Sequence, residues 1–207
     1  MSTAGTAVTS VYEQVLGERF AALHPQLQRY FGVIPAGSVG VGTGVYDIAG
    51  SRRRFLVPLL AGMAWRHVLF PEYARGVPFG IRNTPGAGGT LSARRTFDFS
   101  SRRRIMEDTM RVEEGVLVDA LGRRRGLEVD LHLSVRDGSL RMTSGCLRLR
   151  VGQARLPLPQ LVRLTLVERP DPSRDGAQRV DLRMTAPLLG EVFRYAGTFD
   201  YAIEPAP

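Results

Sequence analysis

The stretch GLEVDLHLSVRDGSLRM, residues 126–142, constrains the fold more than any other part of the chain. Apolar and polar residues alternate from Leu127 to Val135, which is the pattern of a β-strand with one buried face. Asp137-Gly138 then supplies the tight turn of a hairpin. Similar runs, separated by turn signals, follow one another from about residue 77 onward. Together they predict an antiparallel sandwich, a barrel or a strongly curved sheet.

In the strand after this turn, the apolar residues switch from even-numbered to odd-numbered positions. Leu140 and Met142 have one parity, whereas Leu147 and Leu149 have the other, so one face stays inward only if a bulge lies near Gly145. Bulges bend strands and curve sheets. We therefore predict an α+β protein, with a strongly curved antiparallel β-sheet or β-barrel and with N-terminal and crossover helices packed on it or closing it.

The first part of the chain predicts helices. Residues 11–32 carry apolar residues at near-helical spacing, interrupted at Gly17 and Pro25, and indicate two short helices or one kinked helix. We expect residues 1–10 to be flexible and residues 11–207 to form a single α+β domain.

The strand SVGVGTGVYDIA, residues 38–49, has one face that is almost bare. Three glycines share that face: Gly40, Gly42 and Gly44. Bare faces allow a close approach by a packed helix or by a ligand. A helix predicted over residues 52–66 follows directly, and we expect it to lie across the glycines.

Size and composition indicate a globular protein without disulfide bonds and without a membrane-spanning helix. A chain of 207 residues, 43% of them hydrophobic, can bury a substantial core. Its single cysteine, Cys146, excludes an internal disulfide framework and indicates a reducing compartment. The N-terminus MSTAGTAVTS has no signal-peptide pattern, and the apolar run of residues 55–65 is shorter than the roughly 20 residues that cross a bilayer. We expect a cytoplasmic protein.

The net charge of +8 comes entirely from arginine, because the chain has no lysine. Triplets begin at Arg52, Arg102 and Arg123, beside glycine or serine in expected turns. Such clusters attract phosphates. The aromatic residues, however, lie on apolar strand faces and do not alternate with the arginines as a base-stacking surface requires. We interpret the triplets as solvated loop charge and predict no nucleic-acid partner.

Ionisable residues on apolar strand faces mark a candidate site, because burying a charge is costly without a partner. Arg95, Asp108 and Glu168 each share a face with apolar residues, and Tyr195 lies between phenylalanines. These four are the predicted catalytic residues: Asp108 or Glu168 as acid and base, with Arg95 and Tyr195 stabilising negative charge. The alternative, which the pattern favours, is an internal salt bridge between Arg95 and one carboxylate.

The last strand, within APLLGEVFRYAGTFDY, has four aromatic residues on one face. Gly197 is expected to leave a gap between Tyr195 and Tyr201, and buried hydroxyls need partners. We predict a cavity for a small, mostly apolar organic molecule. The residues expected to bind this ligand are Tyr46, Phe97, Met110, Phe193, Phe199 and Tyr201. No metal and no cofactor are predicted, because the three histidines are scattered and the usual motifs are missing.

Several stretches resemble a bacterial family, domain-of-unknown-function family 4166. They are LGERFAALHPQLQRYF, RTFDF from Arg95, LPLPQL from Leu156 and APLLGEVFRYAGTF from Ala186. The resemblance spans most of residues 12–203. Its members stand alone or follow an NAD-binding dehydrogenase-like domain, which implies small-molecule chemistry and a dehydrogenase-like partner protein. The family usually has tryptophan where this chain has Ala93, and a glutamate near Asp119, which implies a pocket reshaped for another ligand.

Three functions fit these observations. The first is a ligand-binding barrel, in its catalytic form a cofactor-independent cyclase or isomerase of small-molecule metabolism. The second is a non-catalytic lipid carrier or membrane-surface module, in which RRRFLVPLLAGMAWRHVLF, residues 52–70, lies in an anionic interface. Pro58 within that run counts against a long continuous helix. The third is a protein-interaction domain for a dehydrogenase-like partner.

Overall fold

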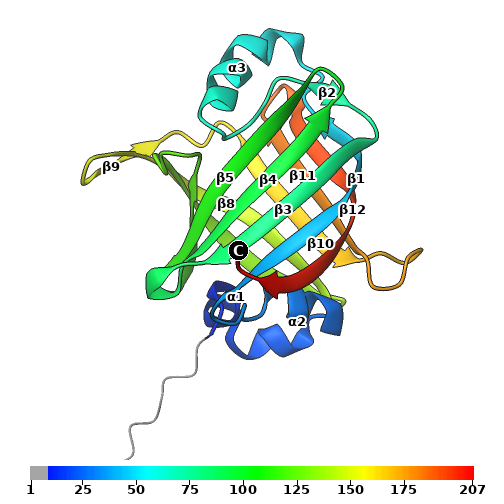
Figure 1. The fold of residues 1–207 in the computed structure, drawn as a ribbon. Coiled ribbons are helices and arrows are strands. Elements are labelled where there is room, and N and C mark those ends of the chain that lie inside the picture. Colours follow the sequence, from blue (N-terminus) through cyan, green and yellow to red (C-terminus); the bar gives the residue numbers. More distant parts are fainter. Residues whose placement is uncertain (1–8) are drawn as a thin grey trace, which may run out of the picture.

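The structure, a computed structural model, describes residues 9–207 and is built around an antiparallel β-barrel (Figure 1). Its strands are β1 (Ser38–Gly50), β2 (Tyr73–Ala74), β3 (Val77–Pro85), β4 (Leu91–Phe99), β5 (Arg102–Glu113), β6 (Val116–Leu121), β7 (Leu127–Arg136), β8 (Ser139–Val151), β9 (Ala154–Leu158), β10 (Arg163–Pro170), β11 (Gln178–Ala186) and β12 (Gly190–Pro205). They pair in the order β10-β11-β12-β1-β3-β4-β5-β6-β7-β8, and β8 also pairs with β10, which closes the barrel. β2 adds to β1, and β9 adds to β8. The predicted fold class is confirmed.

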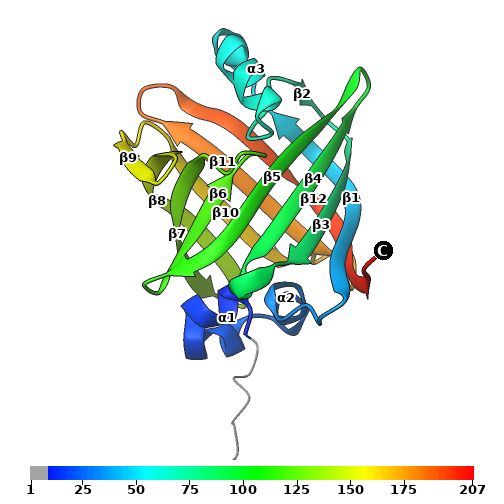
Figure 2. The same cartoon turned by 60° about the vertical axis from the view of Figure 1, so that its left-hand side comes forward.

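Helices lie at both ends of the barrel (Figure 2). Their bounds are α1 (Val11–Leu16), η1 (Gly17–Ala22, a 3-10 helix), α2 (Pro25–Phe31), η2 (Arg54–Leu56, 3-10), α3 (Val57–Trp65) and η3 (Ala87–Gly89, 3-10). α1 and α2 cover one end, and α3 lies at the other (Figure 2). Ser10 caps α1 in a reciprocal pair with Glu13, and the His24 side chain accepts a hydrogen bond from the Gln26 amide at the start of α2. The prediction of two short helices is confirmed, and residues 1–8 of the segment expected to be flexible lie outside the described residues.

The predicted hairpin joins β7 to β8. Asp137 and Gly138 have φ values of 49° and 71°, as a two-residue hairpin turn requires. Along the two strands Val129 faces Leu147, whereas Leu131 faces Ser144, so β8 holds one extra residue at this point. The expected bulge near Gly145 is therefore present, and it keeps the apolar residues on both sides of it inward.

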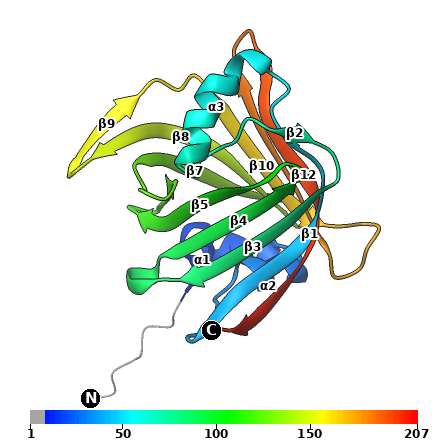
Figure 3. The same cartoon turned by 45° about the horizontal axis from the view of Figure 1, so that its top comes forward.

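The bare face of β1 points into the barrel, and no helix lies across it. A Cβ on Gly40 would overlap the Tyr201 hydroxyl, and one on Gly42 would lie 2.7 Å from a methyl of Ile81. The glycines therefore make room for side chains of the neighbouring strands. The helix after β1 is α3, at the end of the barrel rather than on this face (Figure 3). The prediction of a helix across the glycines was wrong, because the sheet curls until its own aromatic side chains cover them.

The core is the barrel interior. The largest fully buried side chains there are aromatic, among them Tyr46, Phe97, Phe193 and Phe199. Arginines of the outer wall pair instead with acidic residues of neighbouring strands, as Arg148 does with Asp130. Within residues 9–207, no helix is long and apolar enough to cross a membrane.

Candidate functional site

The strand register places all ten predicted site residues on the inner face of the barrel. Tyr201 pairs with Gly42, Gly42 with Ile81, and Ile81 with Arg95, so these residues share one face. Glu168 is connected in the same way, through its partner Val180 on β11. The residues that the alternation placed on the apolar face of each strand therefore all point into the same barrel interior.

Arg95 and Asp108 form an ion pair between β4 and β5. The Asp108 side chain is buried and that of Arg95 is largely covered, with 3% and 15% of their surface exposed. The other oxygen of Asp108, Oδ2, has no hydrogen-bond partner among the described residues. The salt bridge that the sequence left as the alternative to catalysis is therefore present, and it neutralises Arg95 inside the barrel.

Asp119 adds a second carboxyl beside this pair. It lies on β6 opposite Met110, one diagonal step from Asp108 on the same face. Burial raises the pKa of Asp119 well above its usual value, and the negative charge of Asp108 raises it further. The protonated form of Asp119 is therefore favoured, and Asp108 is the carboxyl that contacts Arg95.

Glu168, on β10, is the third buried carboxyl of the barrel interior. Burial raises its pKa to about 7, against the opposing effects of a hydrogen bond from Gln178 and the attraction of Arg95. Only 5% of Glu168 is exposed. At neutral pH this group is present in both protonation states, which suits it to accept and to donate a proton.

A small internal cavity lies against Glu168. Its volume is about 10 Å³, close to the minimum for one water molecule. The residues around it are Tyr30, Tyr46, Phe79, Ile81, Arg95, Leu166, Glu168, Val180, Tyr195 and Phe199. The cavity therefore joins two of the predicted charged groups to three tyrosines and an apolar wall.

Aromatic rings fill the rest of this region. Tyr46 stacks between Phe79 and Tyr195, with ring centroids 4.2 and 5.1 Å away. A Cβ on Gly197 would lie 2.6 Å from the Tyr46 ring, so the gap expected at Gly197 is occupied by Tyr46. That prediction was wrong, because the ring comes from the neighbouring strand β1, whose register the sequence of β12 does not contain.

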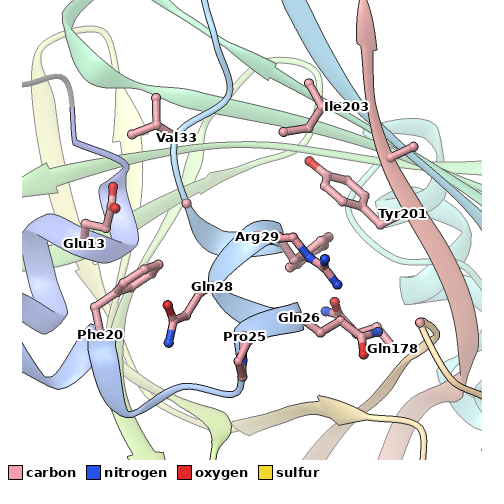
Figure 4. A pocket seen from close by; sticks show the side chains of 14 residues that line it. Glu13, Phe20, Pro25, Gln26, Gln28, Arg29, Val33, Gln178, Tyr201 and Ile203 are labelled. Carbon is pink, nitrogen blue, oxygen red and sulfur yellow. The ribbon is translucent and has the colours of Figure 1, made fainter.

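A much larger groove, of about 770 Å³, opens at the α2 end of the barrel. Figure 4 shows it between α2 and β12, bordered by the side chains of Arg29, Gln178 and Tyr201. Tyr30 lines both this groove and the internal cavity. Gln178 lines the groove and donates its hydrogen bond to Glu168. These two side chains therefore separate the groove from the carboxyl group.

The predicted site residues fall into separate groups. Five of them line the internal cavity: Tyr46, Arg95, Glu168, Tyr195 and Phe199. Asp108 and Phe97 contact this group through the ion pair and ring packing, and the sulfur of Met110 accepts a hydrogen bond from Tyr12. Phe193 packs on Phe70, and Tyr201 borders the outer groove.

Four buried polar residues were not among the predicted site residues. Tyr30 and Gln178 contact the site around Glu168, whereas Tyr12 and Asp119 lie outside its cavity wall. The two polar strand residues carried a usable signal. Asp119 shares a face with Leu117 and Leu121, and Gln178 shares one with Val180, so both meet the test that selected Asp108. The two tyrosines lie on short helices, and only the structure shows which end of the barrel those helices cover.

The histidines do not gather at the site. His24 caps α2, and His132 is exposed. His67 follows α3, and its Nδ1 lies 3.3 Å from Oε2 of Glu107. In the part of the chain that the structure describes, no group of three histidine, cysteine or acidic side chains could hold a metal ion.

Comparison with known proteins gives a family. The model described as "Domain of unknown function (DUF4166)" matches residues 23–199, as the motifs of the sequence indicated. The uncharacterized protein YndH of Bacillus subtilis (strain 168) is 28% identical over 203 residues, which cover 93% of this chain and 97% of that protein. The matched family region includes all residues that line the internal cavity, but not Tyr12 or Tyr201.

Proposed function

The chain belongs to the DUF4166 family, and we propose that its barrel takes up a small, mostly apolar organic molecule, with which Glu168 exchanges a proton. The single observation that carries the proposal is a buried carboxyl with a pKa of about 7 beside a cavity lined by tyrosines and Arg95. Groups with perturbed pKa values in enclosed sites are typical of acid and base catalysts.

Access is proposed from the groove beside α2. The internal cavity holds no more than about one water, so an organic molecule enters only when the wall moves. Tyr30 and Gln178 are the side chains common to the groove and the surroundings of Glu168. Because α2 is a helix of 7 residues at the barrel end, its displacement breaks no barrel strand pairing.

The chemistry that suits this arrangement is a proton shift. The Glu168 carboxylate takes a proton from a carbon next to a carbonyl group, and the electron pair moves onto the carbonyl oxygen. Tyr195 or Arg95 stabilises that oxygen. Where a C=C bond adjoins the deprotonated carbon, Glu168 then returns the proton to the far carbon of that C=C bond as the electron pair returns from the oxygen. The double bond has moved into conjugation with the carbonyl group, so the product is an isomer and the protein is regenerated. The cycle consumes no oxidant or reductant, and closing a ring by the same proton transfers gives a cyclase.

A non-catalytic carrier is the second candidate. It is favoured by the ion pair with Asp108, because an arginine already neutralised has less charge to offer a reacting oxygen. A carrier would hold the same class of molecule without exchanging its hydrogens.

The binding test is native mass spectrometry of gently purified protein, followed by organic extraction. We expect a stoichiometric apolar compound with the wild type and much less with Tyr195→Phe. Tyr12→Phe is the matched control, since it also removes a buried phenol hydroxyl but one outside the cavity wall. Equal retention by both variants, with an unchanged compound, would contradict the site.

The catalytic test uses the extracted compound in D₂O. We expect the wild type to add deuterium to its carbon atoms and Glu168→Gln to lose this exchange. Asp119→Asn is the matched control, because it changes a buried carboxyl that does not line the cavity. Binding without deuterium uptake by the wild type would select the carrier over the enzyme.

A further inference from the structure

The outer side of α3 is apolar and uncovered. No charged residue occurs from Phe55 to Trp65, yet only Leu60 and Ala64 of the helix are buried. The exposed fractions are 61% for Phe55, 61% for Leu59 and 58% for Trp65. A helix that is apolar on all sides is normally buried, so this one lacks a partner on its solvent side.

A neighbouring turn extends the same apolar surface. Leu188, between β11 and β12, is completely exposed, and Leu189 beside it is 41% exposed. The Arg53 guanidinium donates to the backbone carbonyls of Leu189 and Glu191, at 2.5 and 3.2 Å. These bonds hold the turn beside the start of α3, where the helix caps the end of the barrel (Figure 3).

Arginines without acidic partners surround this surface. Within residues 9–207 no salt bridge is made by six of them: Arg52, Arg53, Arg54, Arg66, Arg123 and Arg124. The Arg123 amide donates to the Arg66 carbonyl, which ties the β6–β7 turn to the end of α3. The guanidinium groups of Arg123 and Arg124 lie 4.8 and 5.6 Å from the centre of the Trp65 ring. The positive charge is thus fixed next to the exposed apolar side chains.

We propose that this α3 end of the barrel docks on an anionic lipid surface. Apolar side chains then enter the boundary of the acyl chains, Trp65 lies at the depth that tryptophan prefers, and the arginines meet lipid phosphates. Pro58 is no obstacle, because it lies in the first turn of α3 and leaves the helix intact. Contact with a second copy of the chain is disfavoured, since a two-fold interface would bring the six arginines against the same six.

Trp65 makes the test specific, because it is the only tryptophan of the chain. Its fluorescence is measured with vesicles of phosphatidylglycerol and phosphatidylcholine, and with phosphatidylcholine alone. We expect a blue shift and quenching by brominated acyl chains on the anionic vesicles only. High salt is expected to reverse both effects, because it shortens the screening length to roughly 3 Å at 1 M.

Two double variants that lose the same net charge distinguish an effect of the α3 end from an effect of overall charge. Arg54→Gln with Arg66→Gln is expected to weaken binding roughly 30-fold, at about a five-fold loss for each charge near the surface. The control, Arg141→Gln with Arg169→Gln, removes two exposed arginines on the part of β8 and β10 nearer the α2 end and is expected to change binding only slightly. Equal losses in the two double variants would overturn the proposal.

A second pair of variants tests the exposed apolar side chains of this surface. Leu59→Asn is expected to reduce vesicle binding several-fold. Ile203→Asn, at an exposed isoleucine beside α2 at the opposite end of the barrel, is expected to leave it unchanged. Binding of DNA as tight as that of anionic vesicles would overturn a lipid preference. A dimer in lipid-free buffer that Leu59→Asn dissociates would overturn it too.

Discussion

Arg95 lies among three carboxyl groups inside the barrel, those of Asp108, Asp119 and Glu168. Burial raises the pKa of Asp119 and so favours its protonated form, whereas Asp108 forms the ion pair with Arg95. Glu168, with a pKa of about 7, is then the group that changes its charge near neutral pH. The proposed chemistry depends on this residue.

Glu168 also makes stability depend on pH. The pKa of about 7 in the folded protein exceeds the ordinary value of 4.5, so between these pH values the folded state binds more protons than the unfolded state. The free energy of unfolding therefore falls as pH rises through this window and levels off above it, by about 3 kcal/mol from this group. Glu168→Gln is expected to remove the decrease.

Urea unfolding of the wild type and of Glu168→Gln across that window measures the effect. Glu204→Gln, at an exposed glutamate, is the control and should follow the wild type at every pH. Parallel curves for Glu168→Gln and the wild type would mean that Glu168 ionises normally in the folded protein.

The ion pair predicts a non-additive pair of substitutions. Arg95→Met leaves the Asp108 carboxylate buried without its partner and is expected to cost about 3–5 kcal/mol. Arg95→Met combined with Asp108→Leu removes both charges and should recover most of this loss. A double-mutant cycle from chemical unfolding checks it, and simple additivity of the two changes would refute the pairing.

Two glycines, one in a strand and one in a helix, are expected to respond in opposite ways to replacement by alanine. A Cβ on Gly44 of β1 would overlap the backbone of β12 at Thr198 and Phe199, so Gly44→Ala forces the paired strands apart. Gly62 of α3 has no atom within 4 Å of such a Cβ. We expect Gly44→Ala to destabilise the protein by roughly 3 kcal/mol and Gly62→Ala to stabilise it by about 1 kcal/mol. Thermal unfolding of both variants tests this, and a mild Gly44→Ala would argue against the close contact of β1 with β12.

The strands show what the sequence can predict. The alternation from Leu127 to Val135 and the Asp137-Gly138 turn are local patterns, and both correspond to β7 and its hairpin. The bulge near Gly145 was predictable because the apolar parity changes on either side of it. The position of α3 was not, because nothing in the glycines of β1 says whether a helix or an aromatic ring covers them.

At the scale of the whole molecule, closure of the barrel brings the site together. Glu168 on β10 and Arg95 on β4 border one cavity, although they are far apart in the sequence. The alternation predicted that each points inward, but their convergence depends on the pairing of β10 with both β8 and β11. The alternation also marks Asp119 and Gln178 as inward residues, but only the strand pairing shows that they lie beside Asp108 and Glu168.

The two ends of the barrel differ in what they present. α2 and α3 lie at opposite ends of the barrel (Figure 1). The α2 end has the groove that leads toward Tyr30 and Glu168, and the α3 end has the apolar and arginine-rich surface. In the proposed account the molecule would dock by one end and exchange its small ligand through the other. The two roles use different residues, so substitutions at Leu59 and at Glu168 should not affect each other's function.

The most direct test of the central claim is the titration of the Glu168 carboxyl by NMR, on protein labelled with ¹³C in its glutamate side chains. Glu168→Gln assigns the signal. We expect one carboxyl resonance that titrates near pH 7 and shifts when the extracted compound is added. If the resonance lost in Glu168→Gln titrates near the ordinary value of 4.5 and ignores the compound, the proposed acid and base site is contradicted.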